Sequence, residues 1–240
     1  MQEFPPEKSV SYPDDVLSLR QMNRVLRHRL RNLCAGLKMT ADRIAEVTAS
    51  THPNLSSRCG VINSEMDNLF EFTARMDLLF DSLPSEAATS LFDLISSLRA
   101  DFVKKYPLCN IELGGPELEL VLPRSSWLRI ALWELIKNAA EAAGGRGSVE
   151  FAWARSQDGG LYFAMLNPGE IPPEIPLAPP APFNTQRSRH DGLGLAIAWR
   201  ICKAMNAEFI IDAPQNGCVA VKLHLPPEEC TDGQSQNSAG

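Results

Sequence analysis

The sequence predicts an α+β protein, with a long helical hairpin in its first third and a mixed α/β part behind it. Apolar residues recur about every 3.5 residues over two long stretches, a spacing typical of helices packed in a bundle. Pro84 and Ser85 interrupt this pattern. Behind them, short helical and alternating segments follow one another over residues 86–226, which is typical of a sheet with helices packed on it.

The first long helix is followed at once by a second. Thr51-His52-Pro53-Asn54 separates them, because proline disfavours helical geometry in the residue before it. Two long helices joined by a short turn predict an antiparallel hairpin over residues 15–83, preceded by a flexible tail at 1–14. The first stripe is formed by Leu19, Met22, Leu26, Leu30, Leu33, Leu37, Thr40, Ile44 and Val47.

Each helix of this hairpin presents a full apolar stripe, so neither is expected to be stable by itself. A two-fold homodimer buries both stripes in a four-helix bundle. The alternative is a hairpin within one chain that docks on the α/β part.

The α/β part is divided by its turn signals. A helix is expected at 86–105, extended segments at 110–113 and 118–122, and a further helix at 125–143 that ends at two glycines. Strands at 148–155 and 161–166 form a hairpin, and a proline-rich loop follows at 167–190. A helix at 194–205, strands at 208–213 and 218–225, and a flexible polar tail at 227–240 complete the chain.

Composition excludes several classes of protein. The chain has 240 residues, 44% of them hydrophobic and 22% charged, which is typical of one large or two small soluble globular domains. A net charge of -6 argues against a dedicated nucleic-acid-binding protein. We expect a cytoplasmic protein without a membrane span, because no long apolar run or signal peptide occurs and the six cysteines are widely spaced.

His28 is the first candidate functional residue. It lies off the apolar stripe, among arginines at 24, 27, 29 and 31, with Asn32 one turn further along the helix. Guanidinium groups bind and neutralise phosphate oxygens, so this stretch is a candidate site for a phosphoryl group. The alternatives are an incidental exposed histidine and a basic helix that contacts nucleic acid or anionic lipid.

A second set of candidates lies in the α/β part. Glu134 and Asn138 are four residues apart and share a helix face, where carboxylate and amide oxygens suit a magnesium ion that also holds nucleotide phosphates. A solvated Glu and Asn at a helix rim is the alternative. Gly192-Leu193-Gly194 directly precedes a helix, whose first N–H groups can hold an anion.

Together these motifs resemble the catalytic core of a two-component sensor histidine kinase over about residues 15–226. His28 to Asn32 is similar to the phosphoacceptor box, and Glu134 to Ala142 to the asparagine box shared with gyrase-type and heat-shock-90-type ATPases. Pro182-Phe183-Asn184-Thr185 resembles the lid motif, and Gly192 to Ala196 the second glycine box. The resemblance implies a dimerisation and phosphoacceptor hairpin at 15–83 and a two-layer α/β sandwich of the Bergerat type at 86–226.

By the same resemblance the chain is a soluble protein-histidine kinase. His28 takes a phosphoryl group from ATP and passes it to an aspartate in the receiver domain of a response regulator, with no nucleic acid as partner. Glu134 is then the acidic group near the metal or the nucleophile, Asn32 orients a water that removes phosphate from the regulator, and Asn138 is the Mg²⁺ ligand. The residues implied for ATP binding are Asn138, Asn167, Gly169, Phe183, Thr185, Gly192, Leu193, Gly194 and Leu195.

Two positions depart from the family pattern. Arg29 follows His28 where the family has an acid that hydrogen-bonds the second imidazole nitrogen, and arginine cannot accept that proton. The first glycine box survives only as Asn167-Pro168-Gly169, in which the Asn167 oxygen replaces an aspartate as acceptor for the adenine amino group. Two functions stay open: a kinase with an adapted pocket, or an ATP-independent histidine phosphotransferase or regulator phosphatase with a degenerate ATP-binding domain.

Overall fold

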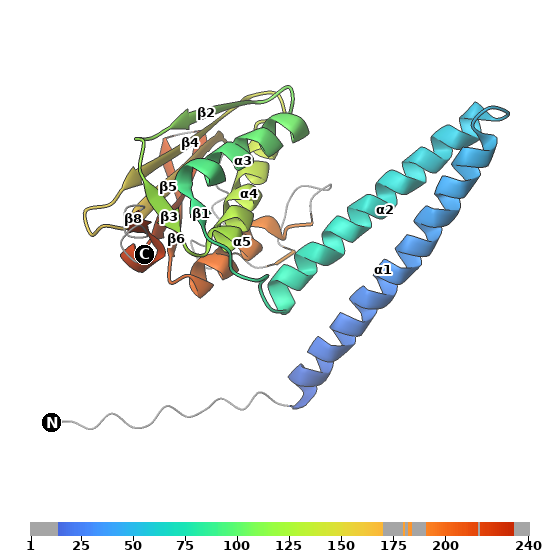
Figure 1. Cartoon of the computed structure of the whole chain (residues 1–240), viewed down its shortest axis with the longest axis horizontal. Helices are drawn as coiled ribbons and strands as arrows, with labels where there is room; N and C mark the ends of the chain where they lie inside the picture. Colours follow the sequence, from blue (N-terminus) through green and yellow to red (C-terminus); the bar gives the residue numbers. More distant parts are fainter. Residues whose placement is uncertain (1–13, 170–179, 181, 184–190, 216, 233–240) are drawn as a thin grey trace, which may run out of the picture. The chain divides into compact units, whose positions relative to one another are not determined.

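The computed structural model describes residues 14–169, 180, 182–183, 191–215 and 217–232 (Figure 1). Its internal contacts divide the chain into two compact units, Met1–Asp81 and Ser82–Gly240. The predicted α+β class is confirmed: two long helices precede an α/β unit with a mixed sheet. Among the described helices, none combines the length and the apolar character needed to cross a membrane. All six cysteines are free.

The first unit is an antiparallel helical hairpin. Helix α1 spans Asp14–Thr48 and helix α2 spans Pro53–Phe80. Proline suits the first turn of a helix because its missing N–H group has no partner there, and Pro53 opens α2 accordingly. The backbone N–H of His52 donates to the carbonyl of Thr48 at 2.8 Å, which closes the turn between the helices.

Helix α1 carries two different stripes. The stripe through which α1 and α2 contact one another is small or polar, and its fully buried members are Arg27, Cys34, Ala41, Cys59 and Thr73. The apolar stripe predicted for α1 lies beside this contact face and outside it. Its members stay between 40% and 62% exposed: Met22, Leu26, Leu30, Leu33, Leu37, Ile44 and Val47.

The second unit is built on a five-stranded sheet in the order β2-β4-β5-β7-β6. Its strands are β2 (Asn110–Gly114), β4 (Ser148–Arg155), β5 (Leu161–Pro168), β7 (Cys218–Leu225) and β6 (Glu208–Gln215). Only the β2/β4 pair is parallel; β4/β5, β5/β7 and β7/β6 are antiparallel. The alternating patterns predicted for β4 and β7 match these strands residue for residue.

Three helices cover one face of this sheet and form the core with it (Figure 1). They are α3 (Leu91–Lys105), α4 (Ser125–Ala142) and α5 (Gly194–Ala204). The rings of Phe151 and Phe163 stack with centroids 5.8 Å apart on the covered face of β4 and β5. This two-layer arrangement is the sandwich that the sequence predicts.

Two short segments differ from their predictions. Helix α3 begins at Leu91 and not at residue 86, because Thr89–Ser90 pairs with β3 (Leu120–Leu122) as strand β1, and the Ser90 hydroxyl accepts from the N–H of Asp93. Residues 227–232 were expected to belong to a flexible tail. They instead form a 3-10 turn at Pro227–Glu229 and strand β8 (Thr231–Asp232), which pairs with β3 on its other edge.

Candidate functional site

His28 lies on the exposed surface of α1, as its position off the apolar stripe predicts. Its Nε2 is 3.4 Å from the Nδ2 of Asn32, which is also exposed and lies one turn further along the same helix. The Nε2 atom is therefore accessible to a reacting group, and the Asn32 carboxamide is the polar group beside it.

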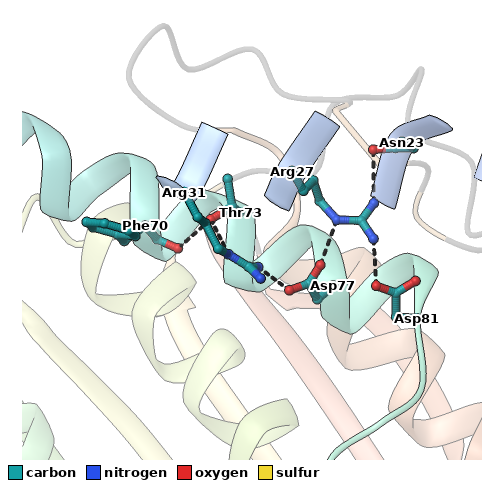
Figure 2. Close-up of polar contacts among 7 residues, drawn as sticks. All are labelled: Asn23, Arg27, Arg31, Phe70, Thr73, Asp77 and Asp81. Atoms are coloured by element: carbon teal, nitrogen blue, oxygen red, sulfur yellow. Dashed lines mark hydrogen bonds and ion pairs between the residues drawn. The ribbon is translucent and has the colours of Figure 1, made fainter. Parts of the chain in front are cut away.

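The arginines around His28 divide into two pairs with different surroundings. Arg24 and Arg29 are exposed. Arg27 is instead buried against α2, where its Nε donates to Asp77 at 2.6 Å and its Nη2 to Asp81 at 2.6 Å (Figure 2). The expectation that all four arginines surround a phosphoryl group is wrong for Arg27 and Arg31, because these two face α2 and are bound to carboxylates.

Arg31 completes this network one turn further along α1. Its Nε donates to the hydroxyl of Thr73 at 3.0 Å, and its Nη2 contacts the second oxygen of Asp77 (Figure 2). Burial by itself raises the pKa of the Asp77 carboxyl, but hydrogen bonds from Arg31 and Arg27 favour the charged form and outweigh burial. The resulting pKa lies below the ordinary 3.8, so Asp77 is ionised at neutral pH.

Glu134 and Asn138 lie on α4, at the four-residue spacing that the sequence shows. Asn138 is half-buried. Glu134 is buried and accepts a hydrogen bond from the ammonium of Lys137 at 3.0 Å. Lys137 was not a sequence candidate, although a lysine inside an otherwise apolar helix stretch is itself a signal, because buried lysines need a negative partner.

Asn167 lies near the end of β5, on the face of the sheet that the helices cover, and is 6% exposed. Its Nδ2 donates to the carbonyl of Pro168 at 2.8 Å, which leaves Oδ1 as the acceptor of this carboxamide. Gly169 follows with φ of 153°, a backbone conformation that favours glycine, and donates its N–H to Gly217 at 3.0 Å.

The second glycine motif forms the start of α5. Gly192 has φ of 66°, and its carbonyl accepts from the N–H of Phe183 at 3.2 Å, which joins the lid motif to the glycine motif. Leu193 is fully buried and donates its N–H to Asp191 at 3.2 Å. Gly194 and Leu195 open the helix.

The predicted ATP-binding residues therefore lie on α4, at the end of β5 and at the start of α5. Phe183 is 53% exposed with φ of 64°, and Thr185 lies outside the described residues. His28 and Asn32 belong to the first unit, and the other candidates to the second. Within the described part of the chain, no three His, Cys, Asp or Glu side chains form a metal-binding group.

The comparisons with known proteins agree with this geometry. Residues 124–229 match the family described as histidine kinase-, DNA gyrase B-, and HSP90-like ATPase. The solved structure of full-length ShkA in complex with AMPPNP is similar, with a TM-score of 0.70 at 17% identity, over 86% of this chain and 46% of that one. No curated protein matches the sequence.

Two structures of a second kinase are also similar. ThkA in complex with response regulator protein TrrA has a TM-score of 0.60 at 18% identity, over 90% of this chain and 64% of that one. The catalytic domain of ThkA alone has a TM-score of 0.53 at 21% identity, over 61% of this chain and 99% of that one. This chain thus spans about half the length of ShkA and two thirds of ThkA.

The helical hairpin is followed by a unit in which residues 124–229 match the histidine kinase-, DNA gyrase B-, and HSP90-like ATPase family. The fold is similar to that of the histidine kinases ShkA and ThkA.

Proposed function

We propose that this chain is a protein-histidine kinase of a two-component system, acting in the cytoplasm as its cysteine spacing predicts. It phosphorylates itself on His28 with ATP and passes the phosphoryl group to an aspartate of a response regulator. The observation that carries the proposal is an exposed His28 on a helical hairpin whose chain continues into an ATPase domain.

The reaction is an in-line transfer. A bond forms between Nε2 of His28 and the γ-phosphorus while the bond from that phosphorus to the bridging oxygen of ADP breaks. The charge-spread transition state needs cations and N–H donors more than covalent help. Arg24 and Arg29 are the exposed cations on the same helix segment, and Asn32 stands beside the attacking nitrogen.

The residues of the α/β unit fit a bound nucleotide with magnesium. The Asn138 carboxamide supplies an oxygen of the kind that Mg²⁺ prefers, and phosphate oxygens complete such a site. Bound Mg²⁺ would neutralise charge on the phosphates. The Asn167 Oδ1 accepts the adenine amino group, and the open backbone at Gly192 and Gly194 lets the first turn of α5 approach the phosphates. Gly169, Phe183, Leu193 and Leu195 are the other described residues that the resemblance implies for ATP binding.

Glu134 acts beside this pocket. Lys137 holds its carboxylate by a 3.0 Å hydrogen bond, so the carboxylate is oriented before the substrate arrives. Glu134 is the candidate acceptor for the imidazole proton, and it would orient water near Mg²⁺ if the metal were bound.

The partner proteins are a second copy of this chain and a response regulator. The exposed apolar stripe of α1 has the 3.5-residue spacing of a bundle seam and lies beside the face that contacts α2. A homodimer buries it in a four-helix bundle. The similar structure of ThkA with its regulator TrrA supports a receiver domain as the second partner.

The second candidate function is an ATP-independent histidine phosphotransferase or regulator phosphatase. Arg29 favours it, because an exposed arginine next to His28 cannot accept the Nδ1 proton that a carboxylate would hold. In that case His28 takes its phosphoryl group from an already phosphorylated receiver domain, and Asn32 orients the water that removes phosphate.

Incubation with γ-labelled ATP and Mg²⁺ separates the two functions. We expect acid-labile, base-stable label that is lost in H28Q and kept in H52Q, since His52 is an exposed histidine in the turn between the two helices. Absence of nucleotide binding at millimolar ATP would contradict the kinase. Label taken from a phosphorylated receiver domain, without ATP turnover, would establish the alternative.

A further inference from the structure

A polar network joins α1 to α2 beside His28, and we call it the charge clasp. It consists of Arg27 and Arg31 on α1 and Asp77 and Asp81 on α2, with Asn23 as an additional acceptor (Figure 2). Arg27 uses all three nitrogens of its guanidinium group: Nε on Asp77, Nη2 on Asp81 and, at 2.9 Å, Nη1 on Asn23. The clasp balances two positive charges with two negative ones.

The clasp constrains the helices more strictly than a single ion pair does. Arg27 is 2% exposed, and its planar fork is bound to two different carboxylates one turn apart on α2. Because guanidinium donors lie at fixed angles in one plane, both the rotation and the axial position of α1 are set. A shift of one turn in either direction leaves one of the two arginines without a carboxylate partner, which is costly where the charge is buried, as it is at Arg27.

The remainder of the contact between the two helices selects register weakly. Its buried members, Cys34, Ala41 and Cys59, are small and lack the shape that locks one helix against another. An ion pair between Lys38 and Asp67 at 2.5 Å and a hydrogen bond from Asn63 to Asp42 at 2.6 Å lie further along, both at exposed positions, with Asp67 62% exposed. Buried polar groups are known to specify register in helical bundles at a cost in stability, and the clasp has that character.

The position of the clasp relates it to His28. Arg27 precedes the histidine and Arg31 follows it by three residues, so both flanking turns of α1 are bound to α2. Asp81 is the C-cap residue that follows the last residue of α2, Phe80. We propose that the charge clasp fixes the register of the hairpin and thereby the direction in which His28 faces, with Arg27 as a positioning residue for phosphoryl transfer. The consequence for transfer rests on the kinase function proposed above.

The test replaces the whole clasp with uncharged residues of similar size, in the full-length chain. The variant R27M/R31L/D77L/D81N keeps the net charge and leaves no buried charge alone, so the hairpin is expected to unfold at the wild-type temperature or above it. R27K keeps the charge of Arg27 but loses its fork. K38Q removes an ion pair between the same helices, away from His28, and is the matched control.

Three measurements are made on the wild type, the fourfold variant and R27K, and the last two of them on K38Q, which lacks the lysine that the cross-link needs. Carbodiimide joins an ammonium and a carboxylate in direct contact, so the Lys38–Asp67 cross-link, identified by peptide mass, reports the register without any activity. ATP binding reports the second unit alone. The initial rate of His28 labelling reports the positioning.

For the fourfold variant we expect unchanged ATP affinity, a Lys38 cross-link spread to other carboxylates such as Glu71, and labelling slower by about 100-fold. R27K is expected to slow labelling as well, whereas K38Q labels at the wild-type rate. A fourfold variant that keeps both the Lys38–Asp67 cross-link and the wild-type rate would show that the clasp only stabilises the hairpin. If the wild type takes no label from ATP, the proposed function fails, and the cross-link alone then decides for or against the clasp.

Discussion

At the scale of single residues, the structure separates arginines that look alike in the sequence. Arg27 and Arg31 belong to the small and polar stripe that contacts α2, whereas Arg24 and Arg29 point to solvent. The stripe containing Arg27, Arg31, Cys34 and Ala41 has the same spacing as the apolar stripe beside it. The sequence predicts the apolar stripe but not the polar stripe that contacts α2, since charged residues are rarely fully buried.

Arg29 is the residue whose replacement we expect to raise activity. In R29E, a carboxylate next to His28 can accept the Nδ1 proton and make Nε2 more basic and more nucleophilic. We expect the initial rate of labelling from ATP to increase roughly tenfold, which is less than the rate increase that a positioned general base usually contributes. The measurement is the initial rate of acid-labile label at saturating ATP.

R58E is the control for this prediction, because it makes the same charge change on an exposed position of α2. Equal rates in R29E and wild type would show that Arg29 does not limit the reaction. A slower rate in R29E than in R58E would show that the guanidinium itself assists transfer.

At the scale of elements, the success of prediction depends on element length. Long strands such as β4 and β7 follow from alternation within their own sequence, and α4 follows from its apolar spacing and terminal glycines. The two-residue strands β1 and β8 are too short to show an alternating pattern. They form because each pairs with one edge of β3. The spacing of Glu134 and Asn138 on one helix face was predictable from the sequence in the same way. The contact between Glu134 and Lys137 was not, because it depends on burial, which local spacing does not report.

Strand β8 and the turn before it are expected to support the α/β unit. Glu229 is 3% exposed, and one of its carboxylate oxygens accepts from the Nε of Arg124 at 2.9 Å. A chain that ends at Pro226 lacks Glu229, the partner of Arg124, and lacks strand β8, which pairs with one edge of β3. We expect this to lower the free energy of unfolding by about 3 kcal/mol. We expect thermal unfolding of the α/β unit about 6–12 °C below wild type.

The matched control for this truncation is a chain that ends at Asp232, which keeps the turn and β8. It is expected to unfold at the wild-type temperature. Equal unfolding temperatures for the chains ending at Pro226 and at Asp232 would mean that β8 adds no stability to the sheet.

At the scale of the whole molecule, the two stripes of α1 have separate roles. The stripe with the charge clasp joins α1 to α2 within one chain, while the apolar stripe has no cover among the described residues of the hairpin. An exposed apolar seam of this length marks a protein contact surface. The 3.5-residue spacing further indicates a helical partner, and in the proposed homodimer a second copy of the hairpin would supply it.

Charge placed in the apolar stripe is therefore expected to separate two copies of the chain. Leu30 and Leu37 lie on that stripe at 44% and 47% exposure, and burying a glutamate at each position of a dimer seam is strongly unfavourable. We expect wild type to sediment as a dimer and L30E/L37E as a monomer at micromolar concentration.

M39E is the control, because Met39 is 72% exposed and lies off the stripe, so it should sediment as wild type does. A wild-type chain that is monomeric at these concentrations, or an L30E/L37E variant that remains dimeric, would assign the stripe to contact with another part of the same chain. The hairpin of one chain leaves the stripe uncovered, so the question is whether two chains associate through it. Sedimentation answers this question directly, whereas activity does not.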